Sequence, residues 1–262
     1  MAKRVPEGPA PEPAVQKLRL RYAKRGRLRF TSTRDFQRAL ERAVRRAGVP
    51  MAYSAGFHPH PKISYAGAAP TGAASEAEYV ELSVTERVAP ERLRAALDAA
   101  LPDGLDILEV VEAEAGALAE RLQASLWQLE LRGMPEHELV AAVTAFLAQE
   151  RVEVTRMMKR GPRTFDVREA VVSLGASPSK DRACAILTMV VRHTTPAVRP
   201  DDVLTALREV AGLVPPSPPL VTRLAQGPLE TATARVADPL AADRDGDGAA
   251  AGDAPTREPG TA

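Results

Sequence analysis

The residues best suited to chemistry lie in one short loop, Phe57-His58-Pro59-His60-Pro61-Lys62. Its prolines favour extended backbone, so we expect His58 and His60 to point the same way. Two imidazoles on one side suit metal ligation, phosphate binding when protonated, or a rigid contact surface. A structural turn at a sheet edge is the remaining interpretation. A metal would need a further ligand, and because His137 and His193 belong to the other half of the chain we expect none.

Tyr53 precedes this loop and could form an acid–base pair with His58. One group would deprotonate a ribose 2′-hydroxyl and the other would protonate the leaving oxygen, as in an RNA-cleaving enzyme. The sequence contains no nucleophile motif, Gly-rich phosphate loop or dinucleotide-binding pattern. Tyr53, His58 and His60 are therefore catalytic candidates only, and the chain is not expected to be an enzyme by itself.

The loop follows the most basic stretch of the chain, with twelve Lys or Arg and two acids between residues 15 and 46. The net charge of this stretch is +10, against −6 for residues 66–228 and −4 from residue 229 onward. Such asymmetry indicates a polyanion-binding surface, the alternative being a solvated arginine-rich face. We expect Phe57, His58, His60 and Lys62 to contact substrate or partner. The expected phosphate ligands are Arg19, Arg21, Arg27, Arg29, Arg38, Arg42 and Arg45.

The first elements follow from sequence patterns. Apolar and basic residues alternate over residues 15–22, which predicts a strand, and residues 27–30 are expected to continue as a strand. Ser32 and Asp35 mark a helix start. The helix stripe would be Phe36, Leu40, Ala43, Val44 and Ala47, and Gly48 would end the helix.

The order of elements predicts an α+β fold made of a tandem pair of ferredoxin-like βαββαβ units. The first, basic unit would span residues 15–112, and a helix at residues 113–126 would connect it to the second unit at residues 127–228. Within the second unit, residues 163–172 read as extended, with a turn as the alternative for 167–174. A single mixed sheet built from the same elements is the alternative architecture. The arm at residues 1–14 and the acidic tail at residues 229–262 lack apolar periodicity, which predicts disorder.

Cys184 is the only cysteine, which excludes an internal disulfide and any cysteine-ligated zinc or iron–sulfur site. The N-terminal residues lack the apolar core of a signal peptide, and no apolar run is long enough for a membrane helix. These features predict a cytoplasmic protein without contact to a membrane.

Several blocks of this sequence together resemble the radical SAM-linked domain of unknown function, in its stand-alone form. The longest is Gly56–Ser64, GFHPHPKIS; the others are RLRFTS from Arg27, Asp35, RALERA from Arg38, RRAG from Arg45, Tyr53-Ser54, Gly72, Ser75 and EAEY from Glu76. The resemblance covers about residues 16–112. Where that family often has a histidine after the capping serine, this chain has Thr33.

The resemblance implies an accessory, substrate-recognising protein that works with a radical SAM enzyme on RNA or a ribonucleoprotein, because such domains occur beside genes for a ribonuclease E/G-type enzyme and ribosomal proteins. Radical SAM chemistry needs a CxxxCxxC motif, which this chain lacks. S-adenosylmethionine and the iron–sulfur cluster are therefore expected in the partner, and no cofactor in this chain. Two alternatives remain: a docking module for the radical SAM partner without RNA contact, and a His-dependent ribonuclease of tandem ferredoxin-like layout.

Overall fold

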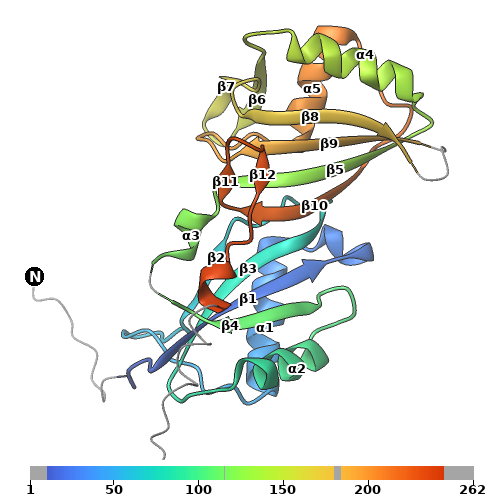
Figure 1. Ribbon diagram of the computed structural model, residues 1–262. Coiled ribbons are helices and arrows are strands. Elements are labelled where there is room, and N and C mark those ends of the chain that lie inside the picture. Colours follow the sequence, from blue (N-terminus) through green and yellow to red (C-terminus); the bar gives the residue numbers. More distant parts are fainter. Residues whose placement is uncertain (1–10, 115, 180–183, 245–262) are drawn as a thin grey trace, which may run out of the picture.

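The structure is a computed structural model that describes residues 11–114, 116–179 and 184–244. Residues 1–10 of the expected arm and 245–262 of the expected tail lie outside the described residues. The described chain is a mixed α/β structure around one large sheet of eight strands, with helices packed against it (Figure 1). Within the described part, no helix combines the length and the apolar character that crossing a membrane requires.

The first half of the chain contributes four strands in the order β4-β1-β3-β2, each antiparallel to its neighbours. Alternate residues of β1, Leu18, Leu20 and Tyr22, pack against Phe36 and other apolar residues of the helices. The helices therefore cover one face of this half-sheet. Its elements are β1 (Gln16–Lys24), a 3-10 helix η1 (Gly26–Phe30), α1 (Thr33–Arg46), β2 (Ile63–Ala66), β3 (Ala74–Val84), α2 (Pro90–Ala100) and β4 (Ile107–Glu112).

Helix α1 begins as its sequence predicts. Ser32 is the N-cap, and its hydroxyl accepts a hydrogen bond from the backbone N–H of Asp35 at 3.2 Å. The expected strand at residues 27–30 is wrong, because these residues form η1. Gly26 has a φ of +54° and turns the chain out of β1, so the following residues leave the sheet.

The second half contributes four strands in the order β10-β5-β9-β8, again antiparallel. The expected connecting helix at residues 113–126 is reduced to the four residues of α3. The expected extended run at residues 163–172 is divided by a turn between β7 and β8, the alternative that the sequence left open. The elements are α3 (Leu118–Arg121), β5 (Ala124–Arg132), α4 (Glu136–Leu147), β6 (Glu153–Met158), β7 (Gly161–Asp166), β8 (Val171–Pro178), β9 (Cys184–Arg192), α5 (Pro200–Ala211) and β10 (Leu220–Gly227).

The two halves share one sheet because β3 and β10 pair in parallel. Only Ala74 and Ser75 of β3 take part, opposite Thr222 and Arg223 of β10. The other end of β3 pairs with β2. Strand β3 therefore links the half that carries α1 to the half that carries α5 (Figure 1).

Residues 229–244, expected to be disordered, are described and packed. They form β11 (Leu229–Glu230), β12 (Arg235–Val236) and a segment across the face of the first half-sheet that faces away from α1, drawn in red in Figure 1. Leu240 is fully buried in a cluster with Tyr79, Val111 and Leu118. This leucine anchors the segment, and such an isolated apolar residue produces no periodic pattern.

Candidate nucleic-acid interface

The basic face of β1 is not a surface for ligands. Arg19 is fully buried, and its guanidinium is paired with Glu81 at 2.9 Å and Asp243 at 2.6 Å and donates to the carbonyl of Gly116. Arg19 therefore stabilises the fold, and its expected role in phosphate binding has no geometric basis.

Three other cations of β1 and its turn, Arg21, Lys24 and Arg25, are also engaged, whereas Lys17 near the start of β1 is exposed. Arg21 is half-buried and donates to the carbonyl of Glu76 at 2.8 Å, and Lys24 is 5% exposed. Arg25 is paired with Glu76 and with Asp106. The cations between residues 15 and 46 are thus divided between the two sides of the half-sheet. The arginines of α1 lie on the side that this helix covers, and Arg19 and Arg21 of β1 point to the opposite side.

The outer face of α1 presents its cations to solvent. Arg34, Arg38, Arg42 and Arg46 follow one another at intervals of four residues, so they form one row, with Arg45 beside it. All five are exposed, and among the described residues none lies within salt-bridge distance of an acid. Like charges at this spacing repel by a few tenths of a kcal/mol per pair. A bound polyanion would relieve that repulsion.

The 3-10 helix adds two arginines before the start of α1. Arg27 is exposed, whereas Arg29 is half-buried with its guanidinium over the ring of Phe30, 5.5 Å from the centroid. The Nε atom of Arg29 is buried and finds no hydrogen-bond acceptor among the described residues. Phe30 itself is 64% exposed. An arginine next to an open aromatic ring is an arrangement on which a nucleic-acid base can stack.

The His-Pro loop follows the other end of α1 and is closed by backbone hydrogen bonds. The Ser54 N–H donates to the carbonyl of His60 at 2.8 Å, and the His60 N–H donates to the Ser54 hydroxyl at 3.0 Å. The Lys62 N–H donates to the carbonyl of Ala52 at 2.7 Å, which ties the loop to the end of the sheet. These hydrogen bonds brace the loop where it projects from the end of the sheet.

The side chains of this loop face solvent. Tyr53 is 46% and Phe57 61% exposed, and His58, His60 and Lys62 are exposed as well. No group of three or more His, Cys, Asp or Glu within the described ranges is placed to hold a metal ion. The loop thus offers aromatic, imidazole and ammonium groups together at one end of α1.

The exposed aromatic residues are concentrated around α1. Of the described aromatic side chains, Phe30, Tyr53 and Phe57 are the exposed ones. Phe30 precedes α1 and the other two follow it, so these residues flank in the chain the helix that carries the arginine row. We name the set of Arg27, Phe30, the α1 arginines, Tyr53, Phe57, His58, His60 and Lys62 the α1 surface.

A buried polar cluster lies where the two halves meet, and the sequence gives no indication of it. Arg223 of β10 is paired with Glu78 of β3 and donates to the carbonyl of Gly67 at 2.6 Å and to the Gln226 side chain at 3.1 Å. Its guanidinium also lies over the ring of Trp127, 5.5 Å from the centroid. Glu78 belongs to one of the sequence blocks, but its partner on a distant strand leaves no local signal.

Burial changes the ionisation of two groups beside this cluster. Desolvation lowers the pKa of Lys24, an effect that Glu78 opposes and Arg223 reinforces. Desolvation also raises the pKa of Tyr22 well above its ordinary value, and the charge of Glu78 adds to this. Both groups therefore favour their neutral forms more than they would in water. The cluster connects the halves and is closed to solvent, so we assign it no ligand.

A serine–histidine pair joins β5 to the end of β9. The Nε2 atom of His193 lies 2.8 Å from the Ser125 hydroxyl, and Nδ1 lies 2.7 Å from the carbonyl of Leu122. Because a carbonyl only accepts, Nδ1 carries the proton and Nε2 accepts from Ser125. Ser125 is 1% exposed, so a substrate cannot reach its hydroxyl. Part of His193 is open to solvent, but desolvation of the ring lowers its pKa.

Comparison with known proteins places most of the chain in one family. The family model described as an uncharacterized protein conserved in bacteria (DUF2344) matches residues 17–200. No curated protein matches the chain. The matched range includes the whole α1 surface.

Proposed function

This chain belongs to the DUF2344 family of uncharacterized bacterial proteins, and we propose that it is a non-catalytic RNA-recognition protein that works with a radical SAM enzyme. The observation that carries RNA binding is the α1 surface, a row of arginines without acidic partners between exposed aromatic rings. Cationic side chains follow a phosphate backbone, and aromatic rings stack on the bases of single strands.

The link to a radical SAM enzyme is supported by the sequence blocks that resemble the radical SAM-linked domain, above all Gly56–Ser64. The residues of this block form the braced loop and the start of β2, next to the end of the arginine row. We propose that the loop contacts the partner enzyme or the RNA that both proteins hold. S-adenosylmethionine and an iron–sulfur cluster would belong to the partner, because Cys184 is the only cysteine here.

We further propose that each half of the chain is a ferredoxin-like unit. The support is the strand order: β4-β1-β3-β2 and β10-β5-β9-β8 both place the first and third strands of a βαββαβ series at the centre. In this arrangement the hairpin of β6 and β7 is an insertion in the second unit, between its first helix and β8.

The test is binding of single-stranded RNA to charge-reversed variants. Arg38→Glu with Arg42→Glu should abolish RNA binding, because two phosphate contacts become repulsive. The matched control is Arg132→Glu with Arg208→Glu, which changes the net charge equally at exposed positions of the second half and should leave binding close to wild type. If the two pairs lower affinity equally, α1 is not the RNA surface.

The same variants separate RNA recognition from protein docking. If Arg38→Glu with Arg42→Glu releases a co-purifying radical SAM enzyme and retains RNA binding, the α1 surface is a protein-docking face and the proposal is wrong. Cleavage of labelled RNA by the wild type, but not by His58→Ala or His60→Ala, would overturn the non-catalytic role and identify a ribonuclease.

A further inference from the structure

The hairpin of β6 and β7 carries like charges directly opposite each other. Arg156 of β6 is paired in register with Arg163 of β7, so both side chains lie on the same face of the hairpin. Directly opposed like charges destabilise a strand pair. Lys159 and Arg160 form the turn between the strands and add two more cations.

Only the first of these cations is neutralised within the described chain. Arg156 is paired with Asp202 of α5, donates to the carbonyl of Ala197 at 3.0 Å and lies over the ring of Phe165, 5.0 Å from the centroid. Arg156 is therefore fixed in position. Lys159, Arg160 and Arg163 are exposed and have no acid within salt-bridge distance among the described residues.

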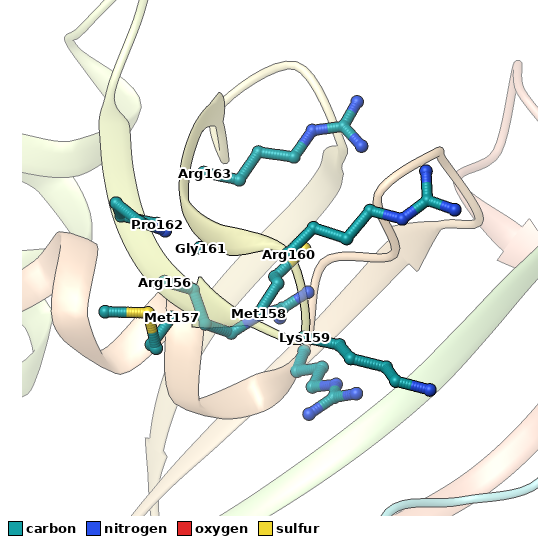
Figure 2. A pocket seen from close by; sticks show the side chains of 9 residues that line it. Arg156, Met157, Met158, Lys159, Arg160, Gly161, Pro162 and Arg163 are labelled. Atoms are coloured by element: carbon teal, nitrogen blue, oxygen red, sulfur yellow. The ribbon is translucent and has the colours of Figure 1, made fainter.

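These side chains surround a cavity of about 640 Å³. Arg199, which precedes α5, contributes a fifth cation to its lining, together with Arg156, Lys159, Arg160 and Arg163. Figure 2 shows Lys159, Arg160 and Arg163 extending to the same side of the hairpin, away from Met157 and Pro162. Through its pair with Arg156, Asp202 offsets one of these five positive charges.

We propose that this cavity binds a ligand that carries several neighbouring phosphate groups. Guanidinium groups form paired hydrogen bonds with phosphate oxygens, and four arginines and a lysine around one space match a chain of phosphates. The volume lies within the range of small-molecule sites. Among the described residues no aromatic side chain lines the cavity, so the lining offers no platform for a base, and the phosphates are the recognised part.

Two sources would supply this chemistry: a free polyphosphate or nucleotide, and the phosphate groups of an RNA strand. The cavity lies on the second half of the sheet, on elements separate from the α1 surface, so the inference does not depend on the proposed function. A negative result for phosphate binding by the cavity would not contradict RNA binding by the α1 surface, and the reverse also holds.

The experiment is calorimetric titration of the full-length protein with inorganic tripolyphosphate. Arg160→Ser with Arg163→Ser should weaken binding about tenfold or more, because hydrogen bonds to charged groups are lost. The matched control, Arg132→Ser with Arg208→Ser, removes the same charge from exposed positions of the second half outside the cavity lining and should leave tripolyphosphate affinity within about twofold of wild type. Absence of wild-type binding at low salt, or equal losses in both pairs, would overturn the site.

Folding of the variants is checked by thermal unfolding without ligand. Arg160→Ser with Arg163→Ser should unfold at the wild-type temperature or above it, because the opposed charges are removed. Tripolyphosphate should raise the unfolding temperature of the wild type more than that of this variant. If the variant unfolds early, Arg163→Lys replaces it: charge is kept but the paired hydrogen bonds are lost, and an unchanged affinity would refute recognition by arginine.

Competition then distinguishes the sources of phosphate. If a short single-stranded RNA displaces tripolyphosphate from a variant that lacks two cations of the α1 surface, Arg38→Ser with Arg42→Ser, the cavity binds RNA phosphates. If adenosine triphosphate displaces it and RNA does not, the ligand is a free phosphate compound. Either result supports the site, whereas displacement by neither contradicts it.

Discussion

Arg19 and Asp243 are 224 positions apart in the chain, and their side chains form an ion pair of 2.6 Å in which neither is exposed to solvent. The same carboxylate accepts from Arg121 at 2.8 Å and from the backbone N–H of Glu114 at 3.0 Å. The last described residues thus close over the first strand, and an arginine that resembles a phosphate ligand in the sequence is part of the core.

Asp243→Ala is expected to lower the free energy of unfolding by about 3–5 kcal/mol, because it leaves the buried charge of Arg19 without this partner. Urea denaturation measures the effect. The control is Arg244→Ala, whose pairs with Glu109 and Asp238 are partly exposed and should contribute less than about 1 kcal/mol. Equal losses in the two variants would show that residues 237–244 are held by something other than this ion pair.

Gly67→Ala is expected to destabilise the protein by about 2 kcal/mol or more. Gly67 has a φ of +57°, and a Cβ atom there would lie 2.2 Å from Oε1 of Gln226. Gln226 would have to move and give up its bonds to Arg223 and to the carbonyl of Ala77. Thermal and urea unfolding report the loss.

The control for Gly67 is Gly175→Ala in β8, where a Cβ atom meets nothing within 4 Å. This substitution should be neutral or stabilise the strand by about 0.5–1 kcal/mol, since alanine has less backbone entropy to lose than glycine. A Gly67→Ala protein as stable as the wild type would mean that the bonds of Gln226 to Arg223 and Ala77 contribute little.

His193 should make stability depend on pH. Desolvation lowers the pKa of its folded form below the ordinary 6.5, so the unfolded chain binds the proton more readily. The contribution of His193 is then complete above pH 6.5 and is lost as the pH falls through the lowered pKa. In urea denaturation between pH 5 and 7, His193→Gln should show a shallower dependence of stability on pH than the wild type.

The control is His137→Gln on the exposed surface of α4, which removes a histidine from the same half of the chain without touching Ser125 or Leu122. A steeper dependence in His193→Gln would contradict a lowered pKa for His193. That outcome would mean that the hydrogen bond to Leu122, which raises the pKa, outweighs desolvation.

The contributions of base stacking and of phosphate contacts to RNA affinity should be measurable separately. Tyr53→Ala and Phe57→Ala are each expected to weaken binding by about 1–3 kcal/mol without changing its salt dependence. Arg42→Ser should lessen the slope of log affinity against log salt by about 0.7, the value for one single-strand phosphate contact. Fluorescence anisotropy over a salt series measures both quantities.

The control is Val214→Ala, which alters a similarly exposed apolar side chain of the second half outside the cavity lining and should leave RNA affinity unchanged. If Tyr53→Ala and Phe57→Ala also match the wild type, the rings at the end of α1 do not bind bases, and RNA recognition would rest on charge alone.

Local signals predicted much of the first half correctly. The Ser32 cap, the buried stripe from Phe36 to Val44 and the stop at Gly48 each depend on residues a few positions apart. The alternation of β1 was also right, since Leu18 and Leu20 face the helices. Alternation separates two faces of a strand, but it does not say whether the polar face meets water.

The predictions of exposure or disorder were wrong where a segment distant in the sequence packs against the residue. Arg19 is buried because Glu81 and Asp243 meet it there, and Leu240 is buried because Tyr79 and Val111 provide a place for it. Tyr53, Phe57, His58 and His60 are exposed, as their expected contact with a substrate or partner requires. The cationic cavity was not predictable from the sequence, because Arg199 joins the hairpin through the packing of α5.

The parallel pairing of β3 with β10 has a consequence for synthesis on the ribosome. Arg223 follows Glu78 by 145 residues. Because translation adds about 5–20 residues per second, Arg223 is synthesised roughly 7–30 s after the buried acid that it neutralises. During that interval Ala74 and Ser75 form an open strand edge, and the carboxylate of Glu78 remains hydrated. Newly made chains of this protein therefore pass through a period in which the first half exposes an unpaired edge to other chains, and slower translation lengthens it.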